Sequence, residues 1–106
     1  MSLELISRVQ RYAPVRGADR SLLLKLADEG DEASGIASFR LDRLSRLLEV
    51  TPGGVEEMLA RLMRQGLLSA VPDAEIPIPI AWREREPGLR WVRINVEAPP
   101  PGALLH

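Results

Sequence analysis

The residue types that most often carry out acid–base, nucleophilic or metal chemistry are scarce in this sequence. It has no cysteine, and its one histidine is His106. A multi-histidine metal site and a Ser/His/Asp or Cys/His catalytic group are therefore excluded within one chain. The carboxylates of Glu56 and Glu57 would diverge on a helix, and Gly53-Gly54 lacks the lysine and preceding strand of a phosphate-binding loop. We predict that the protein is not an enzyme and uses no metal and no cofactor.

Arginine is the one chemically versatile residue that the sequence supplies in quantity. All but one of the 14 basic residues are arginine, and 15 acidic residues bring the formal net charge to −1. Arginine suits bidentate contacts to phosphate or guanine, although a GC-rich genome would supply the same excess of arginine codons. DNA binding is driven largely by the release of counterions from phosphates. A chain with no overall positive excess must therefore place its basic residues locally.

The residues that could contact DNA fall into three groups along the chain. One group lies on a predicted helix, one on and just before the helix that follows it, and one on a predicted hairpin, where two glutamates leave a local charge of 4 − 2 = +2. The groups are Arg40, Arg43 and Arg46; Thr51, Gly53, Gly54, Glu57, Arg61 and Arg64; and Arg83, Arg85, Arg90 and Arg93.

The stretch from Arg40 to Leu68 must position the first two groups. Its leucines recur at i, i+3 and i+7 before Glu49, and apolar residues recur at i, i+4 and i+7 after Pro52, so the spacing predicts two helices. Thr51 is a good N-cap, Pro52 suits the first helical position, and Gly66 suits the end of the second helix. Two helices joined by a corner of about four residues predict a helix-turn-helix.

Other periodic segments predict the rest of the fold. We expect a helix over 3–12, a helix from Asp19 or Ser21 to about Asp28, and an acidic loop over 28–35. Strands are expected over 36–38 and 67–71, and strands 81–85 and 89–96 would form a β-hairpin. In that hairpin Val92, Ile94 and Val96 would face the core. The segment 76–80 alternates isoleucine with proline, so it would form an edge strand or an extended arm.

The stretch from Tyr12 to Leu68 resembles the winged helix-turn-helix proteins of phage and plasmid replication and regulation. Ser21-Leu22-Leu23-Leu24-Lys25-Leu26-Ala27-Asp28 and the acidic residues after it resemble that family's leucine-rich helix and acidic turn. The resemblance implies an α+β, mostly α, winged helix-turn-helix fold with a small antiparallel β-sheet and a hairpin wing. It also implies a second helix that reads base edges. There the family carries Arg, Lys, Gln, Ser or Thr, whereas this chain has Gly53-Gly54 and Glu56-Glu57.

The resemblance therefore favours one function, namely a protein that binds double-stranded DNA as a transcriptional regulator or replication accessory. The wing arginines would hold phosphate, and Arg61 and Arg64 would anchor the second helix. Local pairing is an alternative use of these charges, because Glu57–Arg61 and Asp42–Arg46 are both spaced i, i+4. Glu56 and Glu57 would then only stabilise the helix dipole in the first turn, although a glutamate can also accept a hydrogen bond from cytosine.

The second function is a protein-interaction module of the same fold with weak or no DNA binding. The stripe on the N-terminal helix would pack on its own domain or form a homodimer contact. Trp82 and Trp91 would pack on the core or on each other across strands, whereas an exposed Trp91 beside Arg93 would suggest a partner surface. The candidate interface residues are Leu5, Val9, Tyr12, Ile78, Trp82 and Trp91.

The length of 106 residues predicts a single domain. We expect that domain over 1–97, with an N-terminal helix in 1–13, the core and wing in 18–97, and a flexible tail in 98–106. No apolar run approaches the roughly 20 residues of a membrane span, and no signal peptide is visible. We expect a cytoplasmic protein that does not bind a membrane.

Overall fold

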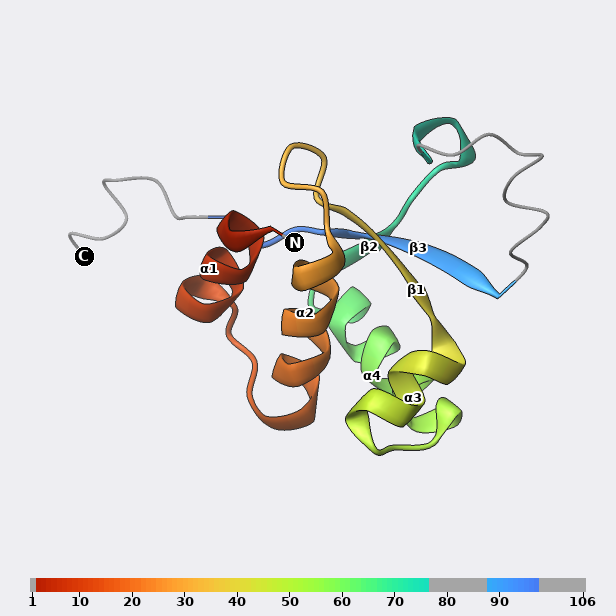
Figure 1. Ribbon diagram of the computed structural model, residues 1–106. Coiled ribbons are helices and arrows are strands. Elements are labelled where there is room, and N and C mark those ends of the chain that lie inside the picture. The colour runs from red at the N-terminus through yellow and green to blue at the C-terminus, as the bar shows by residue number, and fades with distance from the viewer. Residues whose placement is uncertain (1, 77–87, 98–106) are drawn as a thin grey trace.

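The computed structural model describes residues 2–76 and 88–97, which form four helices and a three-stranded antiparallel sheet (Figure 1). The fold is therefore α+β and mostly helical, as predicted, and its layout is consistent with a winged-helix-like one. The elements in chain order are α1 (Leu3–Tyr12), α2 (Gly17–Glu29), β1 (Ile36–Arg40), α3 (Leu41–Leu48), α4 (Pro52–Arg64), β2 (Leu68–Ala70), the 3-10 turn η1 (Asp73–Glu75) and β3 (Leu89–Ile94).

The strand that comes last in the chain lies in the middle of the sheet. The strand order is β1-β3-β2, with Ile36 opposite Arg93 on one side and Leu68 opposite Ile94 on the other. The predicted strand over 89–96 is confirmed as β3 over Leu89–Ile94. Its predicted hairpin partner over 81–85 lies outside the described residues, as does the isoleucine–proline segment beyond Ile76.

Side chains alternate across β3 as the sequence predicts. Val92 and Ile94, and Val96 just after the strand, are buried, and they face the helices. Trp91 and Arg93 point to the other side of the sheet and are half-buried. The sheet therefore contributes one apolar face to the core, which is the arrangement expected when one face of an antiparallel sheet packs on helices.

The core is built from leucine and valine on all four helices. Its fully buried members include Leu22 and Leu23 from α2 and Leu62 from α4. Leu5 and Val9 of α1 are also fully buried in it, so the stripe on α1 packs on its own domain. Of the two uses predicted for this stripe, packing on its own domain accounts for Leu5 and Val9, and a homodimer contact through the N-terminal helix stays a prediction.

The corner of the helix-turn-helix contains a residue in the left-handed conformation. Glu49 has φ 56° and ψ 39°, and the Val50 N–H donates to the Ser45 carbonyl at 3.1 Å to close the end of α3. The Ser45 hydroxyl donates to the Val50 carbonyl at 2.7 Å. The predicted cap of α4 is confirmed, since the Thr51 hydroxyl accepts the Gly54 N–H at 3.0 Å. These bonds fix the angle between the two helices.

Replacing Glu49 by glycine should stabilise the protein. A left-handed residue other than glycine carries a steric cost of about 1–2 kcal/mol, part of which is offset because glycine gives the unfolded chain more freedom. We expect Glu49→Gly to raise the free energy of unfolding by about 0.5–1 kcal/mol in urea titrations. The comparison variant Glu49→Val should lower it, and a lower stability for Glu49→Gly would show that the left-handed turn is not costly here.

The end of α4 is a Schellman motif. The Leu67 N–H donates to the Leu62 carbonyl and the Gly66 N–H to the Met63 carbonyl, both at 3.0 Å, while Gly66 has φ 76°. The predicted role of Gly66 is confirmed, one residue beyond the cap residue Gln65. The predicted start of α2 is wrong, because the helix begins at Gly17 after Arg16 and neither Asp19 nor Ser21 caps it.

Candidate nucleic-acid interface

The outward face of α4 is the centre of the candidate interface. The buried residues of α4 recur every three or four positions, so they occupy one face of the helix and the opposite face lies in solvent. Gly53 is exposed and has open space around its Cα, so another molecule could approach the backbone there. Thr51 and Gly54 serve the helix cap, and Gly54 is half-buried. The exposed residues of the helix are Pro52, Gly53, Glu56, Glu57, Ala60, Arg61, Met63 and Arg64.

Arg61 ties this face to the first turn of α2. Its Nε and Nη2 donate to the two carboxylate oxygens of Asp19 at 3.0 and 2.9 Å. Such a bidentate pair is the most directional form of an ion pair. The Asp19 side chain is 18% exposed and that of Arg61 44%. The predicted local pair between Glu57 and Arg61 is therefore corrected: Arg61 hydrogen-bonds across the fold, and Glu57 acts on it only as a weaker, more distant charge.

The Arg61–Asp19 pair should make stability depend on pH. Hydrogen bonding to Arg61 holds the pKa of Asp19 below its ordinary value. A lowered folded-state pKa means that this stabilisation is present above the unfolded value, near pH 4, and is lost as the pH falls through the folded pKa. We expect the free energy of unfolding to fall below about pH 4, and to fall less steeply in Asp19→Asn.

Urea titrations between about pH 2.5 and 6 would measure this dependence, a range that covers the ordinary aspartate pKa. Arg61→Gln is the matched control, because it removes the cause of the shift and leaves the carboxylate. It should flatten the profile as Asp19→Asn does. Parallel profiles for all three proteins would contradict the assignment.

Arg90 ties the other end of α4 to the sheet. Its Nη1 donates to Glu56 Oε1, and both side chains are roughly half exposed. Arg90 lies opposite Phe39 in the β1–β3 ladder, and its guanidinium lies 5.4 Å from the centre of the Phe39 ring. This contact is a cation–π interaction. The first residues of β3 therefore lie beside the first turns of α4, so a predicted wing arginine and the predicted reading helix share one surface.

Arg93 has a different environment from the one predicted. Its Nη2 donates to Glu75 Oε1 at 2.9 Å and its Nε to the Ser34 carbonyl at 3.3 Å, and the side chain is 29% exposed. It connects η1 and the turn before β1 to the middle of the sheet. The contacts indicate a role in holding these loops rather than a free phosphate contact.

The basic residues around α3 are also placed differently from the prediction. Arg40 is the last residue of β1 and not part of the helix, because its backbone pairs with Leu89 of β3. The predicted pair between Asp42 and Arg46 is confirmed at 3.1 Å, and Arg40 lies 4.0 Å from the same carboxylate. Arg43 makes no hydrogen bond or ion pair within residues 2–76 and 88–97. It lines a groove with residues of α2 and β1.

Two arginines that the sequence interpretation left out lie close in the chain to Asp19, the residue that joins α2 to the candidate interface. Arg16 precedes α2 and Arg20 lies in its first turn, next to the aspartate that binds Arg61. Neither makes an ion pair with another described residue, and the same is true of Arg64 on α4. Nothing in the sequence signals their position, since the Asp19–Arg61 contact that places them joins residues 42 positions apart.

The remaining predicted site residues divide into two sets. Tyr12 is half-buried against the core, and Trp91 is half-buried opposite Ser38. The others, Ile78, Trp82, Arg83 and Arg85, lie outside the described residues.

Comparison with known proteins yields no relative for this chain. No family model, no curated protein and no solved structure matches it. Among the described helices, none is both long and apolar enough to cross a bilayer.

Proposed function

We propose that this protein binds double-stranded DNA as a winged helix-turn-helix protein, acting as a transcriptional regulator or a replication accessory. The supporting observation is that two ion pairs, Arg61–Asp19 and Arg90–Glu56, join three elements around the outward face of α4. Basic side chains from α2, α4 and β3 then border one helix. In a helix-turn-helix, the second helix enters the major groove and the elements beside it contact phosphates.

The charge of this surface differs from that of the whole chain. Five arginines and three carboxylates give a local charge of 5 − 3 = +2, against −1 for all 106 residues. A local excess of this sign is what a DNA contact needs, because phosphate contacts supply most of the affinity. The residues counted are Arg16, Arg20, Arg61, Arg64 and Arg90 with Asp19, Glu56 and Glu57.

Existing ion pairs do not prevent these arginines from contacting phosphate. A pair between half-exposed side chains contributes only about 0–1 kcal/mol, so Arg90 can exchange Glu56 for a phosphate at little cost. Arg61 is held more firmly, because Asp19 binds it with two hydrogen bonds and the Asp19 side chain is only 18% exposed. We therefore assign Arg16, Arg20, Arg64 and Arg90 to phosphate contacts, and we assign Arg61 to holding α4 against α2.

Glu57, on this face, weakens DNA binding of any sequence and could also give a preference for one base. Its side chain is exposed and makes no hydrogen bond with another described residue. A carboxylate facing the groove is repelled by phosphates but can accept a hydrogen bond from the amino group of cytosine. Weak non-specific binding together with a preference for cytosine at one position would follow.

The experiment that tests this function is a titration of a fluorescent mixed-sequence duplex with the purified protein across a salt series. Four phosphate contacts predict micromolar or tighter binding at low salt, with a slope of log affinity against log salt of about −3 to −4. Absence of binding at low salt would contradict the proposal. A slope shallower than about −1 would limit the contact to one arginine and would exclude the arrangement around α4.

A second candidate is a protein-interaction module with weak or no DNA binding. It is favoured by the apolar and acidic residues on the same face of α4, where Met63 is 38% exposed and Glu57 is exposed. The salt titration separates the two functions, because only a phosphate-binding surface gives the steep salt dependence.

A further inference from the structure

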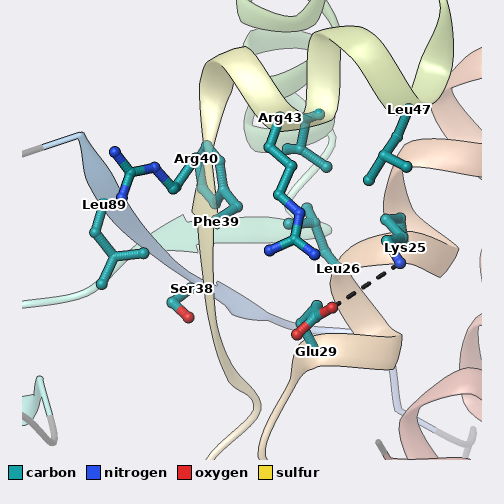
Figure 2. Close-up of a pocket in the computed structure, with 10 residues that line it drawn as sticks. Lys25, Leu26, Glu29, Ser38, Phe39, Arg40, Arg43, Leu47 and Leu89 are labelled. Atoms are coloured by element: carbon teal, nitrogen blue, oxygen red, sulfur yellow. Dashed lines mark ion pairs between the residues drawn. The ribbon is translucent and has the colours of Figure 1, made fainter. Parts of the chain in front are cut away.

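A second surface lies on the other side of α3, in a groove between α2, β1 and α3 with Leu89 of β3 at its edge (Figure 2). Its volume is about 120 Å³. The described residues that line it include none from α4, although its Phe39 also carries the Arg90 guanidinium of the candidate DNA interface. The lining is Lys25, Leu26, Glu29, Ser38, Phe39, Arg40, Arg43, Leu44, Leu47 and Leu89.

The floor of the groove is apolar and its lip is an exposed leucine. Leu26, Phe39 and Leu44 are buried beneath it. Leu47 on α3 is 53% exposed and points toward the groove (Figure 2). A large apolar side chain at the edge of an apolar depression marks a contact surface for another molecule.

The groove also holds one uncompensated positive charge. Lys25 is matched by two carboxylates of its own helix, Asp28 at 3.7 Å and Glu29 at 3.9 Å. Arg43 has no such partner in the part of the chain that the structure describes, and its guanidinium reaches into the groove from α3 (Figure 2). A bound molecule that covers Leu47 would desolvate Arg43 as well, so it must bring a negative charge.

The volume of the groove favours a protein segment over a small molecule as its occupant. Ligand pockets usually have volumes of roughly 300–1,000 Å³, which is well above the volume of this groove. A depression of about 120 Å³ suits a side chain that projects from a larger partner. Amphipathic helices bind grooves in this way, with apolar side chains one turn apart as anchors.

We propose that this groove is a docking site for an acidic amphipathic helix of a protein partner. A leucine-like side chain of that helix enters the groove beside Leu47, and a neighbouring aspartate or glutamate pairs with Arg43. We favour a protein helix over nucleic acid because the floor of the groove is apolar, with Leu26, Phe39 and Leu44 buried beneath it. The docking site adjoins the DNA interface at Phe39, over which the Arg90 guanidinium lies, so its test uses Arg43 and Leu47, which are not among the residues assigned to phosphate.

The test uses two synthetic capped peptides with leucines at i, i+3 and i+4 and either glutamate or lysine beside them. The full chain, labelled with ¹⁵N, is titrated with each peptide and followed by NMR. We expect the glutamate peptide to shift the amide signals of Ser38, Arg43 and Leu47, and the lysine peptide to bind at least about tenfold more weakly, because like charges at a contact cost several kcal/mol.

Two variants make the test specific. Arg43→Glu should weaken binding of the glutamate peptide and strengthen binding of the lysine peptide. Unfolding would weaken binding of both peptides, so it cannot produce this reversal. Leu47→Ser should weaken binding of both peptides, because it removes the exposed apolar side chain at the edge of the groove. Both side chains are exposed, so the fold should persist, and circular dichroism would check this.

Three results of the peptide titrations would overturn the proposal. These are no shifts at millimolar peptide, equal affinity for the two peptides, or shifts confined to the outward face of α4. Shifts at the same three amides that depend on protein concentration without peptide would also overturn it, because a second copy of the chain would then fill the groove.

Discussion

A chain that carries Arg16→Glu and Arg64→Glu should bind duplex DNA at least about 100-fold more weakly than the natural chain. Each arginine supplies a charged hydrogen bond to phosphate, which is about 1.5 kcal/mol or roughly tenfold in affinity, and each new glutamate adds repulsion. The slope of log affinity against log salt should fall by about 2, because each lost phosphate contact lowers it by about 1.

The fold should tolerate this double change. A glutamate at the start of α2 favours the helix dipole, and a glutamate in the last turn of α4 opposes it by a similar amount. Urea titration would check that the free energy of unfolding is preserved. The DNA affinity and its salt slope would be measured by fluorescence anisotropy on one duplex.

The matched control places the same change of charge on the neighbouring helix α3. Arg43→Glu with Arg46→Glu alters the net charge equally but lies on α3, outside the interface that we assign. It should change DNA affinity by no more than a few-fold. An equal loss in both double variants would mean that total charge, and not the surface around α4, governs binding.

Replacing Leu62 by alanine should be the most damaging single change to stability. Leu62 is fully buried in the core, and its carbonyl accepts the Leu67 N–H that ends α4. Truncating a buried leucine costs about 2–5 kcal/mol, because transfer energy is lost and a cavity remains. The total stability of a small domain is only about 5–15 kcal/mol, so the variant should unfold at much lower urea.

Met63→Ala is the control for this prediction, since Met63 is the next residue along α4 and is 38% exposed. It should change the free energy of unfolding by no more than about 0.5 kcal/mol. Similar losses for the two variants would show that the buried face of α4 is not the one assigned.

The parts of the fold that the sequence predicted correctly are those with local causes. The bounds of α1 agree with the prediction, because Ser2 caps the helix and the leucine–valine stripe gives its period. Thr51 and Pro52 start α4 as expected, and Gly66 follows its end. Each of these signals involves residues no more than five positions apart, which a single sequence makes visible.

The parts that it could not predict depend on contacts between distant segments. Glu57 and Arg61 satisfy the local pairing rule, but Arg61 instead binds Asp19, 42 positions away, with two hydrogen bonds. Arg90 and Glu56 are 34 positions apart. Arg40 has a helix-like neighbourhood in sequence, but pairing with β3 keeps it in a strand. The composition of the interface was therefore predictable in part, and its ion pairs were not.

The central position of β3 also determines when the sheet can form during synthesis. Strands β1 and β2 each pair with β3, which is made after both of them. While the ribosome is still adding the residues before Leu89, the helices can collapse on one another, but both strands keep unpaired edges. Such edges pair with the strands of other chains, so a nascent chain that stalls or ends before Leu89 would be prone to aggregate, because β3 does not yet separate β1 from β2.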